Sequence, residues 1–115
     1  MANPVVHFEI LGKDGKALQD YYANLFGWNV NANNPMNYGI VDNQGEGING
    51  GIGPSDGDAR LTVYIEVADL EATLAKAVEL GGKVVQPITE IPGMVTLAQF
   101  ADVAGNVVGI IKSQN

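Results

Sequence analysis

The sequence contains no cysteine and only one histidine among its 115 residues. Without thiols the chain can form neither disulfides nor thiolate-bound metal sites, so any metal would need His, Asp or Glu as ligands. Basic residues are also scarce, with six Lys and Arg against 13 Asp and Glu and a formal net charge of −7. This balance argues against nucleic acid and anionic membranes as partners, because both gain affinity from Lys and Arg.

Long hydrophobic runs are absent as well. No apolar stretch is long enough to span a bilayer, and the first four residues lack the charged and apolar regions of a signal peptide. We therefore expect a soluble, cytoplasmic protein with no membrane partner. Hydrophobic residues still make up 46% of the chain, which is ample for one folded domain of this length.

What the sequence does contain is an internal repeat. The segment His7–Ile10, followed by a helical pattern over about 14–26, matches Tyr64–Val67, followed by a helical pattern over about 69–80. In each half an alternating strand leads to an Asp suited to a helix N-cap, and the helix ends at Gly. Each half then closes with a strand, a tight turn containing Asp and Gly, and a returning strand.

Each half therefore predicts one strand, one helix and three strands. Module one covers about 5–53, a Gly/Pro/Asp-rich linker about 54–60, and module two about 61–112. One module alone would leave apolar surface in water, so we expect both to form a single domain over residues 1–115. The predicted fold is α+β, with two βαβββ modules forming an incompletely closed barrel or trough around a cleft.

Both predicted helices carry an apolar stripe at spacings of three and four, which indicates packing rather than chemistry. The stripe residues are Leu18, Tyr21, Tyr22, Leu25 and Phe26 in the first helix, and Leu70, Leu74, Ala77 and Val78 in the second.

The first strand of each module alternates between apolar and polar residues. In module one, Phe8 and Ile10 share one face, and the period of two puts His7 and Glu9 on the other. We expect the apolar residues to lie under the helices and the polar residues to face the cleft, where a ligand would bind. The polar set is His7, Glu9, Tyr64 and Glu66.

These segments resemble the vicinal oxygen chelate superfamily, which contains glyoxalase I, extradiol dioxygenases and bleomycin-resistance-type binding proteins. The resemblance covers nearly the whole chain. It depends on His7–Ile10, Tyr21–Trp28, Val63–Asp69 with Leu80–Gly82, and Phe100–Asn106, in that order. It implies paired βαβββ modules lining a cleft and, commonly, a homodimer that completes or buttresses the site.

The resemblance also implies where a divalent metal would be held, with one ligand near the start and one near the end of each module, usually His or Glu. His7 occupies the first position, and its counterpart in module two is Tyr64, or Val63 if the alignment slips by one residue. The closing positions fall at Gly109 in module two and among Asn49, Gly50 and Gly51 in module one. One ligand in four remains, and a single imidazole cannot hold a metal against water. We predict that the protein has neither metal nor cofactor.

The favoured hypothesis is a metal-independent small-molecule-binding protein that sequesters an aromatic compound or antibiotic, as bleomycin-resistance proteins do. Aromatic and methionine side chains suit such a cleft because they offer large, adaptable apolar walls. The predicted ligand-binding residues are His7, Glu9, Trp28, Tyr38, Tyr64, Glu66, Met94 and Phe100. No catalytic residue is assigned.

Two other functions stay open. One is a metal-dependent glyoxalase-like lyase, isomerase or dioxygenase in which His7, Glu9 and Glu66 form a rearranged ligand set. The two glutamates are equally what half-exposed strands ordinarily present to solvent. The other is an accessory domain whose cleft serves only as an interface. The sequence does not specify the ligand, because a few cleft residues and loops determine specificity.

Overall fold

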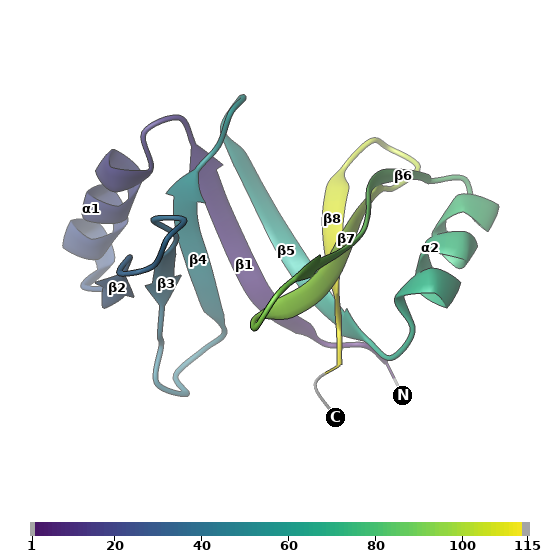
Figure 1. Ribbon diagram of the computed structural model, residues 1–115, viewed down its shortest axis with the longest axis horizontal. Coiled ribbons are helices and arrows are strands. Elements are labelled where there is room, and N and C mark those ends of the chain that lie inside the picture. The colour runs from purple at the N-terminus through teal and green to yellow at the C-terminus, as the bar shows by residue number, and fades with distance from the viewer. Residues whose placement is uncertain (1, 114–115) are drawn as a thin grey trace. The chain divides into compact units, whose positions relative to one another are not determined.

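The computed structural model describes residues 2–113. The described chain divides into two compact units, one formed by Val6–Thr62 and the other by residues 2–5 together with 63–113. To within a few residues at their borders, these units are the predicted modules one and two. The predicted repeat of strand, helix and three strands is present in both (Figure 1). The assignment of residues 1–115 to a single domain stays a prediction.

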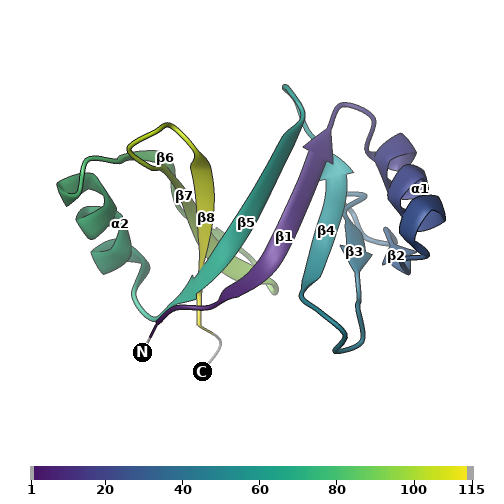
Figure 2. The ribbon, with the colours of Figure 1, turned by 180° about the vertical axis from the view of Figure 1, so that it is seen from behind.

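Module one contains β1 (Val5–Gly12), α1 (Gly15–Phe26), β2 (Val30–Asn31), β3 (Gly39–Val41) and β4 (Asn49–Pro54). Its strands lie in the order β2-β3-β4-β1. β3 is antiparallel to both of its neighbours, whereas β1 and β4 are parallel. Figure 2, the view from behind, shows β1 and β4 side by side.

Module two contains β5 (Arg60–Val67), α2 (Leu70–Glu79), β6 (Lys83–Ile91), β7 (Val95–Ala101) and β8 (Val107–Lys112). Its strand order, β5-β8-β7-β6, reproduces that of module one, with β5 and β8 parallel and the other two pairs antiparallel. The predicted α+β class and the βαβββ modules are therefore confirmed.

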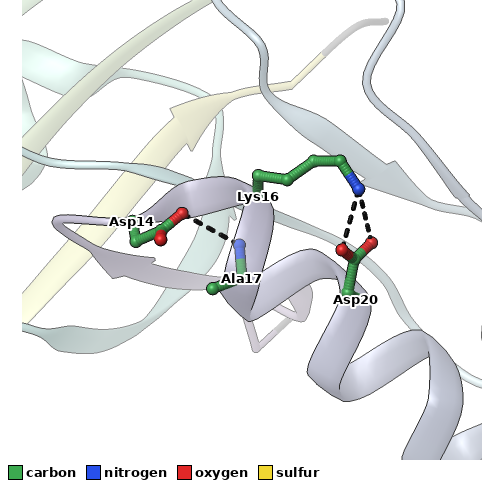
Figure 3. Close-up of polar contacts among 4 residues, drawn as sticks. All are labelled: Asp14, Lys16, Ala17 and Asp20. Carbon is green, nitrogen blue, oxygen red and sulfur yellow. Dashed lines mark hydrogen bonds and ion pairs between the residues drawn. The ribbon is translucent and has the colours of Figure 1, made fainter.

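The helices begin where the sequence predicts. The carboxylates of Asp14 and Asp69 accept hydrogen bonds from the backbone N–H groups of Ala17 and Ala72, both at 3.0 Å. These bonds satisfy N–H groups that lack a partner in the first helical turn. Figure 3 shows the cap of α1 together with the exposed ion pair between Lys16 and Asp20. Glycines with positive φ, Gly27 and Gly81, follow the helices as predicted.

The hydrophobic core of module two lies between α2 and its sheet. Leu70 and Leu74 of the predicted stripe are buried there, while Val78 is 48% exposed. The core cluster consists of Val67, Leu70, Leu74, Ala98 and Ile110, with Ile65 and Phe100 packed against it. No helix among residues 2–113 is long and apolar enough to cross a membrane.

The predicted packing of α1 is wrong for most of its stripe. Tyr21, Leu25 and Phe26 are between 56% and 60% exposed, and the helix buries Gly15 and Gln19 instead. The cause is the close approach of the helix to β4: a Cβ on Gly15 would lie 2.6 Å from the backbone nitrogen of the last residue of that strand. Since this contact fixes which side of α1 faces the sheet, it turns the apolar stripe toward solvent.

Candidate functional site

The sheet of module one has two chemically different faces. Phe8 of β1 points to the side of α1, where its ring lies 5.3 Å from that of Trp28, which in turn lies 5.9 Å from Tyr22. Because side chains alternate along a strand, His7 and Glu9 point to the opposite side. We call that side the open face of module one. Trp28, a predicted ligand-binding residue, is thus on the helix side rather than beside His7 and Glu9.

Tyr38 joins the two polar residues on the open face. Its hydroxyl lies 2.9 Å from Nε2 of His7 and donates a hydrogen bond of 3.0 Å to Oε2 of Glu9. A hydroxyl has one hydrogen, so a Tyr38 that donates to Glu9 must accept from the N–H of His7. This assigns the proton of the neutral imidazole to Nε2. The result is a pair of linked hydrogen bonds in which the Glu9 carboxylate is an acceptor.

The segment before β3 positions Tyr38. The side chain of Asn34 accepts hydrogen bonds from the N–H groups of Met36 and Tyr38 and donates one of 2.7 Å to the carbonyl of Tyr38. Asn37, with φ of 53°, makes the turn into the strand, a conformation that Asn adopts more readily than most residues. The side chain of Asn34 therefore holds the backbone of Tyr38 in place.

A glycine on β4 gives the Tyr38 ring its place. Gly51 pairs with Glu9, and a Cβ built on Gly51 would lie only 1.9 Å from atoms of the Tyr38 ring. On the helix side, a Cβ on the adjacent Gly50 would lie 2.3 Å from the ring of Phe8. Gly50 and Gly51 of β4 thus permit close approach of aromatic rings on the two faces of the sheet.

Module two repeats this arrangement with neutral groups. Tyr64 pairs with Gly109, and a Cβ on Gly109 would lie 2.3 Å from the Tyr64 ring. The side-chain amide of Gln99 donates a hydrogen bond of 2.9 Å to the Tyr64 hydroxyl. Tyr64 and Gln99 are both about 5% exposed or less. Tyr64, rather than Val63, is therefore the residue opposite the closing position of this module.

The remaining predicted residues are dispersed in module two. Glu66 is half-buried, on the same side of β5 as Tyr64. Phe100 packs against the core on the helix side and lines a groove of about 580 Å³ beside α2. Met94 is 52% exposed, in the turn between β6 and β7. The structure does not bring Phe100 and Met94 to the face that carries Tyr64 and Glu66, and ligand contact by any of them stays a prediction.

Burial determines the charge of His7. Loss of solvent around the imidazole lowers its pKa below the usual 6.5. His7 is therefore neutral at pH 7.

The metal site of the vicinal oxygen chelate superfamily does not fit these residues. Nε2 of His7 carries the hydrogen donated to Tyr38, so it offers no lone pair to a metal in this arrangement. Gly51 and Gly109 supply no ligand, and tyrosine rings fill the space that a side chain there would need. Among residues 2–113, no cluster of three His, Asp or Glu side chains is arranged to hold an ion.

The sequence matches a family model described as a glyoxalase-like domain over residues 8–111. The chain belongs to the glyoxalase-like domain family. This match, together with the solved structures below, confirms the resemblance to the vicinal oxygen chelate superfamily. A comparison with curated proteins finds no match.

Several solved structures share the fold of this glyoxalase-like domain. Methylmalonyl-CoA epimerase from Mycobacterium tuberculosis is 12% identical, with a TM-score of 0.68, covering 96% of this chain and 88% of its own. A glyoxalase/bleomycin resistance protein/dioxygenase superfamily member from Vibrio splendidus is 14% identical, with a TM-score of 0.63 and coverages of 97% and 100%. The 2,2',3-trihydroxybiphenyl 1,2-dioxygenase from Sphingomonas wittichii is 15% identical, with a TM-score of 0.68 and coverages of 100% and 42%. At such identities the likeness shows the fold alone.

Proposed function

We propose that this glyoxalase-like domain is a metal-independent small-molecule-binding protein, which sequesters an aromatic compound such as an antibiotic in the cytoplasm. The observation that carries the proposal is the pair of tyrosine rings over Gly51 and Gly109. Gly109 is the closing position of module two, and Gly51 is one of the three residues among which that of module one falls; at both glycines the chain has no side chain and an aromatic ring in its place. Two such losses, one in each module, support a protein that uses the fold without the metal.

The polar side chains on the two sheets suit recognition of a small molecule. Module one offers an imidazole, a phenol hydroxyl and a carboxylate in one hydrogen-bonded chain. Module two offers the buried Tyr64 and Gln99 pair. Ligand sites are typically apolar walls with a few fixed polar groups that set orientation, and both sets are fixed by their hydrogen bonds.

The first test measures metal. Purified protein is incubated with Mn, Fe(II), Co, Ni and Zn, freed of weakly held ions by gel filtration, and analysed for metal per chain by mass spectrometry. We expect far less than one ion per chain. Near-stoichiometric metal that is lost in His7→Ala and kept in Asp42→Ala would overturn the proposal. It would favour the alternative, a metal-dependent glyoxalase-like lyase, isomerase or dioxygenase using His7 with Glu9 and Glu66.

The proposal includes a homodimer, and the exposed stripe of α1 is the surface that supports it. Tyr21, Leu25 and Phe26 present contiguous apolar groups along one helix. Covering such a patch in a second copy would stabilise the pair. Light scattering should then give about twice the chain mass of 12.1 kDa, and Leu25→Glu should yield the monomer. Leu80→Glu, at an exposed apolar residue next to the other helix, is the matched control; a monomeric wild-type protein would contradict the dimer.

A further inference from the structure

The rings of His7 and Tyr38 form one nearly flat surface. Their planes differ by 16° and their centroids lie 6.4 Å apart. Nε2 and the phenol oxygen both lie at ring edges, so the 2.9 Å hydrogen bond between them joins the rings edge to edge rather than face to face. The pair therefore offers a broader aromatic surface than either ring alone.

This ring pair is held rigidly on the sheet. The Tyr38 ring lies against β4 at Gly51, and at Gly53 a Cβ would approach the ring to 3.1 Å. Asn34 fixes the backbone of Tyr38 through three hydrogen bonds to the segment 36–38. Both rings are half-buried, so each keeps some exposed surface. A rigid surface loses little conformational entropy when a ligand binds to it.

The two linked hydrogen bonds of the ring pair run in one direction. His7 donates to Tyr38, and Tyr38 donates to Glu9, so the acceptor end of the chain is the Glu9 carboxylate. A carboxylate has about four lone-pair sites, so it can accept several donors at once. The formal net charge of −7 attracts cations to the protein and repels anions.

We infer that the ligand is a planar aromatic molecule bearing an amino or amidino group, which stacks on the His7–Tyr38 ring pair and donates its N–H groups to Glu9. The inference rests on the proposed function and adds the chemical class of the ligand. Stacking provides the apolar contact. The charge-assisted hydrogen bond to Glu9 distinguishes an aromatic amine from an aromatic acid or a plain hydrocarbon.

Three acridines of the same ring system separate these contributions. Proflavine carries amino groups, acridine carries none, and an acridine carboxylate carries an acid. Binding is followed by fluorescence anisotropy at physiological salt, where diffuse attraction between exposed charges is screened. We expect proflavine to bind more tightly than acridine, and the carboxylate to bind least.

The variants assign the contacts. Glu9→Gln should weaken proflavine at least about tenfold and leave acridine nearly unchanged, because it removes a charge-assisted bond but no ring. Tyr38→Leu should weaken both dyes, whereas Tyr38→Phe keeps the ring and should retain acridine binding. Glu46→Gln is the control, since it removes the same charge from an exposed loop of the same module.

Each contrary outcome has a distinct meaning. Equal losses in Glu9→Gln and Glu46→Gln would show diffuse electrostatics and overturn the inference. So would proflavine binding that is insensitive to Glu9→Gln and both Tyr38 variants, or the absence of binding by any acridine. These results bear on the ligand class alone and leave the proposed metal-independent function untouched. Stoichiometric metal in the same samples would instead contradict the proposed function.

Discussion

Two glycines determine where the tyrosines of the site can lie. We expect Gly51→Ala and Gly109→Ala each to lower the free energy of unfolding by about 1–3 kcal/mol, because the added carbon must displace an aromatic ring. Urea denaturation of both variants measures this.

The control for the glycine variants is Gly47→Ala, at a position where a Cβ meets no atom within 4 Å. Its effect should stay within about 0.5 kcal/mol, as for other surface substitutions. Equal destabilisation by Gly47→Ala and Gly51→Ala would mean that displacing the Tyr38 ring does not lower the free energy of unfolding.

His7 makes stability depend on pH. Burial lowers its pKa in the folded state, so below about pH 6.5 the unfolded chain binds more protons than the folded one. Stability should therefore fall as the pH drops from 6.5 through the lower pKa of the folded state. Urea denaturation at several pH values should show this loss in the wild type. His7→Gln, which keeps a polar side chain opposite Tyr38 and Glu9, should lack that part of it; identical pH profiles would contradict the assignment.

Single residues of the site were predictable only where strand alternation determines their direction. His7, Glu9, Tyr64 and Glu66 follow from a period of two. Gln99 has the same signal, a polar residue between apolar neighbours on β7, but nothing in the sequence indicates that it reaches the Tyr64 hydroxyl. The bond depends on the register between β5, β8 and β7, which arises from long-range pairing.

At the scale of elements, α1 is attached to its sheet by a polar side chain. The amide of Gln19, which is 6% exposed, donates to the carbonyls of Ile52 and Asn37 at 2.8 and 2.9 Å. Gln19→Leu should cost about 1–3 kcal/mol of stability, because it leaves the buried carbonyl of Ile52 and the partly buried carbonyl of Asn37 without this donor. Thermal or urea unfolding measures the change. Asn24→Leu, on an exposed position of the same helix, should have little effect, and a similar loss in both variants would show that Gln19 acts through helix propensity alone.

These contacts of Gln19 with the sheet also explain why the side of α1 that faces the sheet was not predictable. Periodicity located both helices, and their capping residues gave their ends. It also predicted a buried stripe, which is right for Leu70 and Leu74 of α2 but wrong for Tyr21, Leu25 and Phe26 of α1. An apolar stripe shows that a helix has a face to cover, not which partner covers it. In α1 a small residue, Gly15, and Gln19 occupy the sheet contact instead.

At the scale of the whole molecule, the two modules differ in how much regular structure they contain. Module two has strands of six to nine residues and a buried cluster under α2, whereas β2 and β3 of module one have two and three residues. Amide hydrogen exchange should therefore be slowest at Leu74, Ala98 and Ile110 and faster in β2 and β3, since protection follows buried contacts and long ladders. Equally slow exchange in β2 and β3 would mean that the modules open only together.

The order of elements along the whole chain was the feature most predictable from the sequence, because of the internal repeat. Duplication repeats local patterns, so the order of elements and the turns can be read twice in one chain. The repeat also predicted that Tyr64 lies on the first strand of module two and Gly109 on its last strand. Tyr38 was expected to bind ligand, but its place over Gly51 depends on a loop that has no counterpart pattern in the other half.

The tyrosine rings over Gly51 and Gly109 also constrain the mutational routes open to this chain. A carboxylate introduced at either glycine would collide with a ring, so a substitution that places a metal ligand there is disfavoured until the tyrosine is lost. Losing the tyrosine first removes a hydrogen-bond partner of His7 or of Gln99 before any metal can replace it. Under the proposed function, gaining a metal ligand at Gly51 or Gly109 therefore requires an intermediate sequence that has lost the tyrosine contact and does not yet hold a metal.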